Sequence, residues 1–218
     1  MTLGVDAVSA ALNHSLVNNP QSISGIRIAF PSLWSSATTL VGSAIEEVIA
    51  DVLNRSMPDD SFDNKLNCKF PDIYRRDKTG KIVSAIEIKS WWIHSKEKKP
   101  CFRFSTSKDA CGPDDIIVLV SWVFNQSGNP EVKSVFVENC HELIRQRNQR
   151  WCEDHPGDSI VSPLCERYGG TGRTQITDRP LNGDKGNNFG RLARSKIPAL
   201  DEWIKEQRTL HPEIGRTS

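Results

Sequence analysis

One segment of the chain, Asp115–Phe124, constrains the fold more than any other. Its sequence, DIIVLVSWVF, is almost entirely apolar after the initial aspartate. A strand of this composition is typical of the centre of a sheet that is buried on both faces. Other segments have apolar residues at helical spacing and can cover those faces. The sequence therefore predicts an α/β fold with a central mixed sheet of four to five strands flanked by helices.

The remaining elements follow from the period of the apolar residues. A spacing of three and four residues predicts helices, and alternation predicts strands. We expect helices over 3–17, 37–55, 141–152 and 197–208, and strands over 67–76, 81–92, 101–106 and 132–137. Residues 77–80, DKTG, predict a turn that joins the first two strands into a hairpin. On the helix 141–152, the side chains expected on the wetter side are Arg145, Arg147 and Arg150.

Composition places the chain among ordinary globular proteins. It has 218 residues, of which 37% are hydrophobic and 25% are charged, which suffices for one core of ordinary size. No stretch approaches the roughly 18 to 20 apolar residues that span a bilayer. Residues 1–16 lack the positive segment of a signal peptide. We therefore expect a soluble, cytoplasmic protein.

The six cysteines do not indicate a metal site or a disulfide framework. No C-x-x-C pair occurs, and a chain of this size builds a core without disulfides. Two Cys/His pairs lie twelve residues apart, at 140–141 and 152–155, which along a helix is roughly 18 Å, too far to share a zinc ion. Reduced and mostly buried thiols are expected.

The charges nearly cancel, 28 − 27 = +1, but they are unevenly distributed. Residues 69–100 carry nine basic and four acidic side chains, and residues 173–196 carry six basic and two acidic ones. A protein that coats nucleic acid without specificity is usually more basic overall. Local basic segments beside a cleft instead fit a protein that binds a polyanion at one place, and a solvated surface is the alternative.

The predicted hairpin carries the most informative residues. Glu87 and Lys89 are separated by one residue, so in a strand they project from the same face. Asp72 follows Pro71 on the first strand and lies fifteen positions before Glu87. A hairpin of this length can place Asp72 beside Glu87.

The same strand has an apolar back. Ile82, Ile86 and Ile88 are expected near the core, with Ile86 and Ile88 on the face opposite the charged pair. An exposed hairpin with cross-strand ion pairs is the alternative interpretation of the charged residues.

Two carboxylates and one ammonium group in this arrangement suit metal-assisted hydrolysis of a phosphodiester. Mg²⁺ prefers one or two carboxylates together with water and phosphate oxygens. It polarises a phosphoryl oxygen and lowers the pKa of a bound water. A neighbouring lysine can orient that water and stabilise the charge that develops on the phosphate.

The pattern Pro71-Asp72 followed by Glu87-Ile88-Lys89 resembles the PD-(D/E)xK nuclease superfamily. The resemblance extends over roughly residues 37–150 and implies a restriction-endonuclease-like core. It also implies that Mg²⁺ is held by Asp72, Glu87 and the main-chain carbonyl of Ile88. Lys89 would then assist the attacking water.

Members of the superfamily often carry a further glutamate on the preceding helix in a Gly-x-x-x-Glu setting. The segment Gly42-Ser43-Ala44-Ile45-Glu46 matches this setting. The resemblance therefore implies Glu46 as a fourth catalytic residue, with Glu47 as its alternative.

Within the superfamily, a small chain with long polar, glycine-rich segments most resembles a type II restriction endonuclease. Such an enzyme hydrolyses double-stranded DNA at a defined sequence, which requires side chains that read base edges. The candidates are Arg173, Arg179, Asn182, Lys185, Asn187, Asn188, Arg191 and Arg194. A loop that contacts only phosphates, a mismatch or junction nuclease, and an inactive DNA-binding protein of the same fold are alternatives.

We expect one nuclease domain over 1–218. It would comprise an N-terminal helical extension, 1–36, a catalytic core, 37–152, and a loop-rich DNA-recognition region with a final helix, 153–218. A homodimer is expected, because protein two-fold symmetry mirrors a palindromic site. Trp91 and Trp92 follow the lysine, and at least one should lie in the core because adjacent strand residues face opposite ways.

Overall fold

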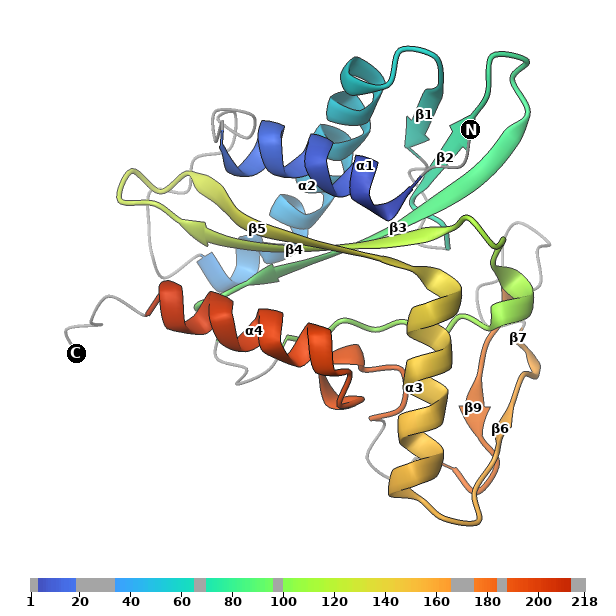
Figure 1. Ribbon diagram of the computed structural model, residues 1–218. Helices are drawn as coiled ribbons and strands as arrows, with labels where there is room; N and C mark the ends of the chain where they lie inside the picture. Colours follow the sequence, from blue (N-terminus) through green and yellow to red (C-terminus); the bar gives the residue numbers. More distant parts are fainter. Residues whose placement is uncertain are drawn as a thin grey trace.

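The computed structural model describes residues 4–18, 34–64, 70–95, 100–165, 175–183 and 188–212. These residues form a five-stranded sheet with helices on both faces (Figure 1). The strand order is β1-β2-β3-β4-β5, with β3 and β4 parallel and the other neighbouring strands antiparallel. The predicted α/β fold around a mixed sheet is confirmed.

The strands of this sheet are β1 Ser61–Asn64, β2 Ile73–Arg76, β3 Ile82–Trp92, β4 Ile116–Phe124 and β5 Pro130–Asn139. Every residue of β4 is buried, as its apolar sequence predicts. Of the strand predicted over 67–76, residues 67–69 lie outside the described residues. Residues 70–72 are not in a strand, because β2 begins at Ile73 and Asp72 lies just before it. The strand β5 pairs back along β4 over its whole length and is longer than predicted.

The sequence misjudged two strands, one that it missed and one that it predicted wrongly. Strand β1 was not predicted because its four residues include one apolar side chain, Phe62. Its backbone pairs with β2 and is also held by the side chain of Asn54, which accepts from the Phe62 N–H and donates to the Phe62 carbonyl, each at 2.9 Å. The strand predicted over 101–106 does not form, and Arg103 and Thr106 make only isolated bridges to distant residues.

The helices are α1 Val5–Leu12, which continues as the π-helix Asn13–Val17, α2 Trp34–Ser56, α3 Cys140–Asp154 and α4 Pro198–Leu210. All four predicted helices are present, and α2 begins three residues earlier than expected. None of the helices in the described residues is both long and apolar enough to cross a membrane.

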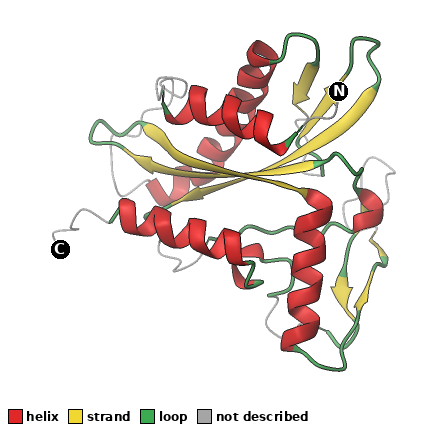
Figure 2. Cartoon of the chain, in the orientation of Figure 1, coloured by secondary structure: helices red, strands yellow, loops and turns green. Residues whose placement is uncertain are grey.

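The two faces of the sheet carry separate apolar cores (Figure 2). On one face α1 and α2 pack on the sheet, with Ile45 and Ile49 against Ile86 and Ile88. On the other face α3 and α4 pack on the sheet, and Leu200, Trp203 and Ile204 of α4 are buried there.

The part predicted to be rich in loops contains four short strands. They are β6 Ile160–Val161, β7 Leu164–Cys165, β8 Gln175–Ile176 and β9 Arg179–Pro180, and they pair as β6–β9 and β7–β8 beside α3. Two short 3₁₀ turns, Lys108–Ala110 and Leu192–Arg194, complete the described elements.

The thiols differ from expectation in burial. Free thiols are found at Cys101, Cys111, Cys140 and Cys152. Among these only Cys140 is fully buried, and Cys101 is exposed. The expectation of mostly buried thiols is therefore wrong for the described cysteines.

Candidate active site

Helix α2 approaches strand β3 closely at Gly42. A Cβ atom at this position would lie 3.2 Å from the hydroxyl of Ser90, so glycine permits the short separation. Glu46 lies one helical turn further along α2 and is partly buried, whereas Glu47 is exposed. The helix thus presents Glu46, rather than Glu47, toward the sheet.

Asp72 is placed beside β3 by hydrogen bonds in both directions. Its N–H donates to the carbonyl of Ile86 at 3.1 Å. Its carboxylate Oδ2 accepts from the N–H of Ile88 at 2.6 Å. Although Asp72 precedes β2, its side chain therefore occupies the place of a ladder partner and lies next to Glu87.

The alternation along β3 separates the apolar side chains from the charged ones. Ile86 and Ile88 are buried in the core formed with α1 and α2. Glu87 and Lys89 project from the opposite face, as predicted. Ile82 was predicted near the core but is 43% exposed, because it lies at the outer end of the hairpin.

Three oxygen atoms converge on the ammonium group of Lys89. The group is hydrogen-bonded to Glu87 Oε1 and donates to the main-chain carbonyl of Ile88 at 3.1 Å. Asp72 Oδ2 lies 3.8 Å from the same nitrogen. These are the three groups that the superfamily resemblance assigned to a metal ion.

The carboxyl groups are strongly affected by burial and by one another. Burial, together with the nearby charge of Asp72, raises the pKa of Glu87 to about 7 against the opposing effect of Lys89. Burial and the charge of Asp72 also raise the pKa of Glu46 to about 7. Burial raises the pKa of Asp72 as well. Burial is the largest cause of the raised pKa values of Glu46 and Glu87, and the charge of Asp72 adds to it in both.

Burial and the neighbouring carboxylates have opposite effects on the pKa of Lys89. Burial alone would lower the pKa of Lys89, but the carboxylates of Glu87 and Asp72 outweigh it, and the pKa lies above its ordinary value. Lys89 is therefore a cation held among acidic groups, and its charge partly compensates theirs.

The donor set fits a small, hard cation. Glu87 Oε2 is buried and has no hydrogen-bond partner among the described residues, which leaves one carboxylate oxygen unsatisfied. Within the described ranges, no three His, Cys, Asp or Glu side chains cluster closely enough to hold a metal by themselves. Two carboxylates and one carbonyl, completed by water, are the ligands that Mg²⁺ accepts and that softer metals do not prefer.

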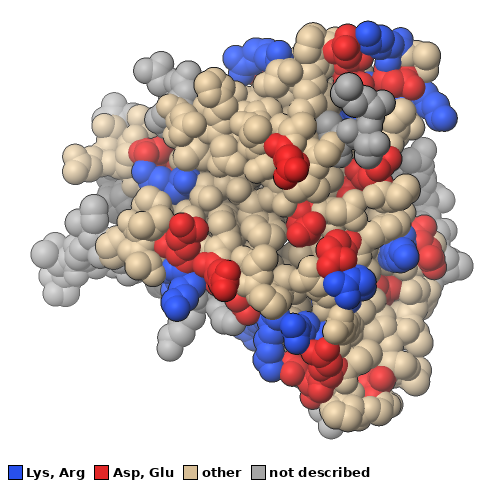
Figure 3. Space-filling model, viewed as in Figure 1, with Lys and Arg blue, Asp and Glu red and all other residues tan. Residues whose placement is uncertain are grey.

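The residues predicted to contact DNA fall into three groups. Arg173, Lys185 and Asn187 lie outside the described residues. Arg179 is exposed on β9, and the backbone of Arg191 forms an isolated β-bridge with the backbone of Arg103. The remaining three, Asn182, Asn188 and Arg194, line one groove beside α3. Basic and acidic side chains are interspersed over the face shown in Figure 3, so this face is not uniformly basic.

A buried ion pair in the C-terminal region was missed. Arg147, predicted on the wetter side of its helix, is fully buried and hydrogen-bonded to the carboxylate of Asp178. Burial lowers the pKa of Arg147 to about 10, and Asp178 limits that decrease. No local signal could have found the pair, because the partners are 31 residues apart and both have the polarity of surface residues.

Trp91 and Trp92 both belong to the core. They are 3% and 5% exposed, respectively. Trp91 packs against Phe102 and Trp203 on one face of the sheet, and Trp92 packs against Trp122 on the other. The expectation that at least one lies in the core is confirmed for both.

Comparisons with known proteins bear on this chain only distantly. No protein-family model matches the chain, and no curated protein matches it in sequence. Among solved structures, the NlaIV restriction endonuclease is similar over 81% of this chain and 68% of that chain, with a TM-score of 0.40 and 14% identity. The function is therefore inferred from this chain's own residues.

Proposed function

We propose that the protein is a Mg²⁺-dependent endonuclease that hydrolyses double-stranded DNA at a defined sequence, as a type II restriction enzyme does. The observation that carries the proposal is the convergence of Asp72, Glu87 and the Ile88 carbonyl on one cationic position beside Lys89. A structural ion pair explains the contacts of Lys89. It does not explain a buried carboxylate oxygen of Glu87 without a partner.

The proposed roles follow from the chemistry of each group. Asp72, Glu87 and the carbonyl of Ile88 would hold Mg²⁺, which supplies Lewis-acid activation of the phosphate and of a water. In this structure the ammonium of Lys89 contacts these oxygens. A metal cation bound by the same oxygens would displace the ammonium toward the substrate. Lys89 would then orient the attacking water and stabilise the negative charge of the pentacovalent phosphate. Glu46 would accept a proton or bind a metal-bound water at the edge of the site.

The apolar back of the strand supports this chemistry. Ile86 and Ile88 are buried against α1 and α2, so β3 cannot rotate or slide without exposing them. The carboxylates are thereby held in position before substrate binds, which is the condition for electrostatic catalysis.

The DNA substrate and the oligomeric state are part of the same proposal. Double-stranded DNA is the proposed substrate, and Arg179, Asn182, Asn188, Arg191 and Arg194 are the described candidates for contacts with it. A homodimer would present two active sites to the two strands of a palindromic site. A mismatch or junction nuclease would use the same metal site, and a DNA-binding protein without activity would retain the fold alone.

A cleavage assay separates these possibilities. The purified protein is incubated with a long, unmethylated duplex DNA in MgCl₂ or in EDTA, beside a Lys89→Ala variant. The matched control is Lys78→Ala, because Lys78 lies in the same hairpin but is exposed and pairs with Asp59. Discrete fragments that require Mg²⁺, persist in the control and vanish in Lys89→Ala support the proposal, and sequencing their ends gives the site.

Other outcomes would change the conclusion. Nicks or a smear that require Mg²⁺ would favour a repair or structure-specific nuclease. Intact DNA from a folded protein that binds duplex would favour the inactive DNA-binding protein. Cleavage that survives in Lys89→Ala would contradict the role of the converging site.

A further inference from the structure

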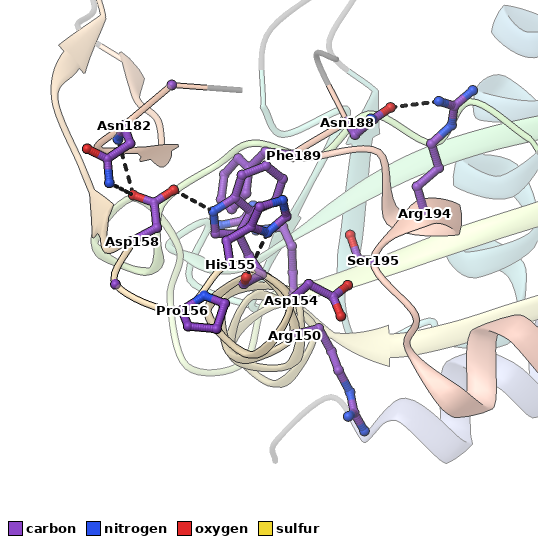
Figure 4. A pocket seen from close by; sticks show the side chains of 14 residues that line it. Arg150, Asp154, His155, Pro156, Asp158, Asn182, Asn188, Phe189, Arg194 and Ser195 are labelled. Carbon is purple, nitrogen blue, oxygen red and sulfur yellow. Dashed lines mark hydrogen bonds between the residues drawn. The ribbon is translucent and has the colours of Figure 1, made fainter. Parts of the chain in front are cut away.

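A groove of about 730 Å³ lies between the C-terminal end of α3 and the segment that precedes α4. Figure 4 shows the side chains that surround it. One side of the groove is formed by Arg150, Trp151 and Asp154 of α3 and by His155, which follows the helix. The other side is formed by Asn182, Asn188, Phe189 and Arg194. This volume is in the range of sites that hold a small molecule or one nucleotide.

The aromatic residues of the groove form one packed group. The ring of His155 stacks on Trp151 with 3.9 Å between centroids and 14° between planes. Phe189 meets Trp151 edge-on at 5.4 Å. His155 is exposed, so the group presents a flat ring at the surface of the groove.

A second side of the groove is organised by Asp158. Its Oδ2 accepts from the indole N–H of Trp151 at 2.9 Å. Its Oδ1 accepts from the main-chain and side-chain N–H groups of Asn182 at 3.1 and 3.2 Å. Both carboxylate oxygens of Asp158 are thus bonded to these donors. The same bonds fix the orientation of the Asn182 amide at the rim of the groove.

The floor of the groove is fixed by the buried ion pair of Arg147 and Asp178. Arg147 donates to the carbonyls of Phe104 and Thr106 at 2.6 and 3.3 Å, and its guanidinium lies 4.7 Å from the ring centroid of Phe189. A buried ion pair adds little stability compared with apolar residues of the same volume. Its consequence here is geometric, because it joins α3 to three other chain segments beneath the groove.

One basic side chain of the groove has no acidic partner among the described residues. Arg150 pairs with Glu153, and Asp154 pairs with Lys196, each at 2.8 Å. Arg194 is exposed and donates instead to the amide oxygen of Asn188 at 2.6 Å. Its charge is therefore available to an anion.

The groove lies on the side of the sheet from which the candidate catalytic side chains project. Leu192 and Ala193, next to Arg194, belong to the same apolar core as Trp91, two residues after Lys89. Helix α3 begins next to β3, since the Cys140 N–H donates to the carbonyl of Asp115, whose side chain accepts from the Ala85 N–H.

Helix α3 spans the distance between the two places. Its 15 residues correspond to about 22 Å at 1.5 Å per residue. A DNA duplex lying along α3 can reach the catalytic side chains near one end and the groove at the other.

We propose that this groove binds one nucleotide of the DNA substrate, with its phosphate on Arg194 and its base against His155 and the amides of Asn182 and Asn188. A cation, a flat ring and fixed amides are the groups that bind a phosphate, stack on a base and recognise its edge. The inference rests on the proposed function and adds Trp151 and His155 of the α3 end to the DNA-binding surface.

The test measures binding of the full-length protein to a fluorescein-labelled duplex in EDTA, by anisotropy over a range of salt concentrations. Arg194→Ala should weaken binding about tenfold and reduce the slope of log Kd against log salt by about one. Arg194→Lys should recover most of the loss. The matched control is Arg55→Ala, an exposed arginine of α2 on the other face of the sheet that pairs with Asp51.

Base recognition is tested separately by cleavage of a randomised duplex pool in MgCl₂ and sequencing of the ends. Asn182→Ala and His155→Ala should relax the base preference at one or two positions and leave the other positions unchanged. Thermal denaturation of each variant verifies that it is folded.

The outcomes distinguish the two proposals. If Arg194→Ala binds duplex as Arg55→Ala does, and Asn182→Ala keeps the wild-type base preference, the groove proposal is overturned and the nuclease proposal is left intact. A wild-type protein that binds no duplex would overturn both. Micromolar binding of free deoxynucleoside monophosphates, with duplex binding unaffected by Arg194→Ala, would instead assign the groove to a free nucleotide.

Discussion

The candidate active site and the C-terminal groove are built by different means. The active site lies on long regular elements, β3 of 11 residues and α2 of 23 residues, with isoleucine side chains packed behind it. The groove lies among strands of two residues each, and side-chain bonds around Arg147 and Asp178 hold it together.

Under the proposed function, this difference would allow catalysis to stay constant while recognition varies. Backbone hydrogen bonds of Asp72 and the apolar burial of Ile86 and Ile88 position the candidate catalytic carboxylates. The groove depends on individual polar contacts, so one substitution can change its shape. A region of this kind can alter what it binds without altering the sheet.

The largest effect is expected at the sheet, where the loss should be one of catalysis and not of binding. Asp72→Asn and Glu87→Gln each remove a charged oxygen ligand, and cleavage should fall about a thousandfold or more. The measurement is the rate of Mg²⁺-dependent cleavage of the mapped site. Duplex binding in EDTA should stay within about threefold of the wild type, and equal losses of binding and cleavage would contradict the division between the two regions.

The next effect is expected at the groove, where the loss should be one of folding. Arg147→Met leaves Asp178 buried without its partner and should lower the free energy of unfolding by about 3–5 kcal/mol. Urea denaturation measures the change. The double variant Arg147→Met with Asp178→Leu should recover part of the loss, because no charge remains buried. A single variant as stable as the wild type would show that the ion pair does not hold this region.

The active site should also make stability depend on pH when metal is withheld. Glu87 has a pKa of about 7 in the folded protein against an ordinary value of 4.5, so the folded state retains a proton that the unfolded state releases. Its contribution to stability is complete below pH 4.5 and is lost as the pH rises through 7. In EDTA the wild type should lose about 1–3 kcal/mol relative to Glu87→Gln between pH 5 and pH 8.

Magnesium reverses this dependence if it replaces the proton. Melting temperatures of the wild type at pH 8 should rise on addition of MgCl₂, and those of Glu87→Gln should rise less. A difference between the two proteins that does not change with pH would contradict the pKa of the buried carboxyl group.

The smallest effect is expected where α3 joins the two regions. The side chain of Asn139 caps this helix by accepting from the N–H groups of His141 and Glu142 at 2.9 and 3.2 Å. Asn139→Ala should lower the free energy of unfolding by about 1 kcal/mol in urea denaturation. The control Gln149→Ala, exposed on the same helix, should change it by less than about 0.5 kcal/mol. Equal effects of both would show that the cap does not contribute.

Local pattern predicted most of the regular elements and the order of the site residues. The apolar period gave the four helices, the β3 and β4 strands and the opposite faces of Ile88 and Glu87. It did not give β1, because that strand is held by Asn54 of α2. It also misjudged 101–106, whose alternating residues are buried but pair with segments far away in the sequence.

In the candidate active site, too, local pattern predicted some features and tertiary packing determined others. The spacing of Asp72, Glu87 and Lys89 was readable because Asp72 directly precedes β2, and a short turn joins β2 to β3, which carries the other two residues. The place of Glu46 depended on how closely α2 crosses β3 at Gly42. The choice between Glu46 and Glu47 was therefore open in the sequence, and in the structure Glu46 is partly buried whereas Glu47 is exposed.

The sequence by itself determined where apolar faces must be buried, and with them the sheet, its covering helices and the side on which Glu87 and Lys89 project. These properties follow from periods of two and of 3.6 residues, which are local. Only the tertiary structure decided that Arg147 is buried on Asp178 and that Arg194, Asn182 and His155 meet at one groove. Those contacts join residues tens of positions apart, and their energies depend on burial and on partners that no local pattern contains.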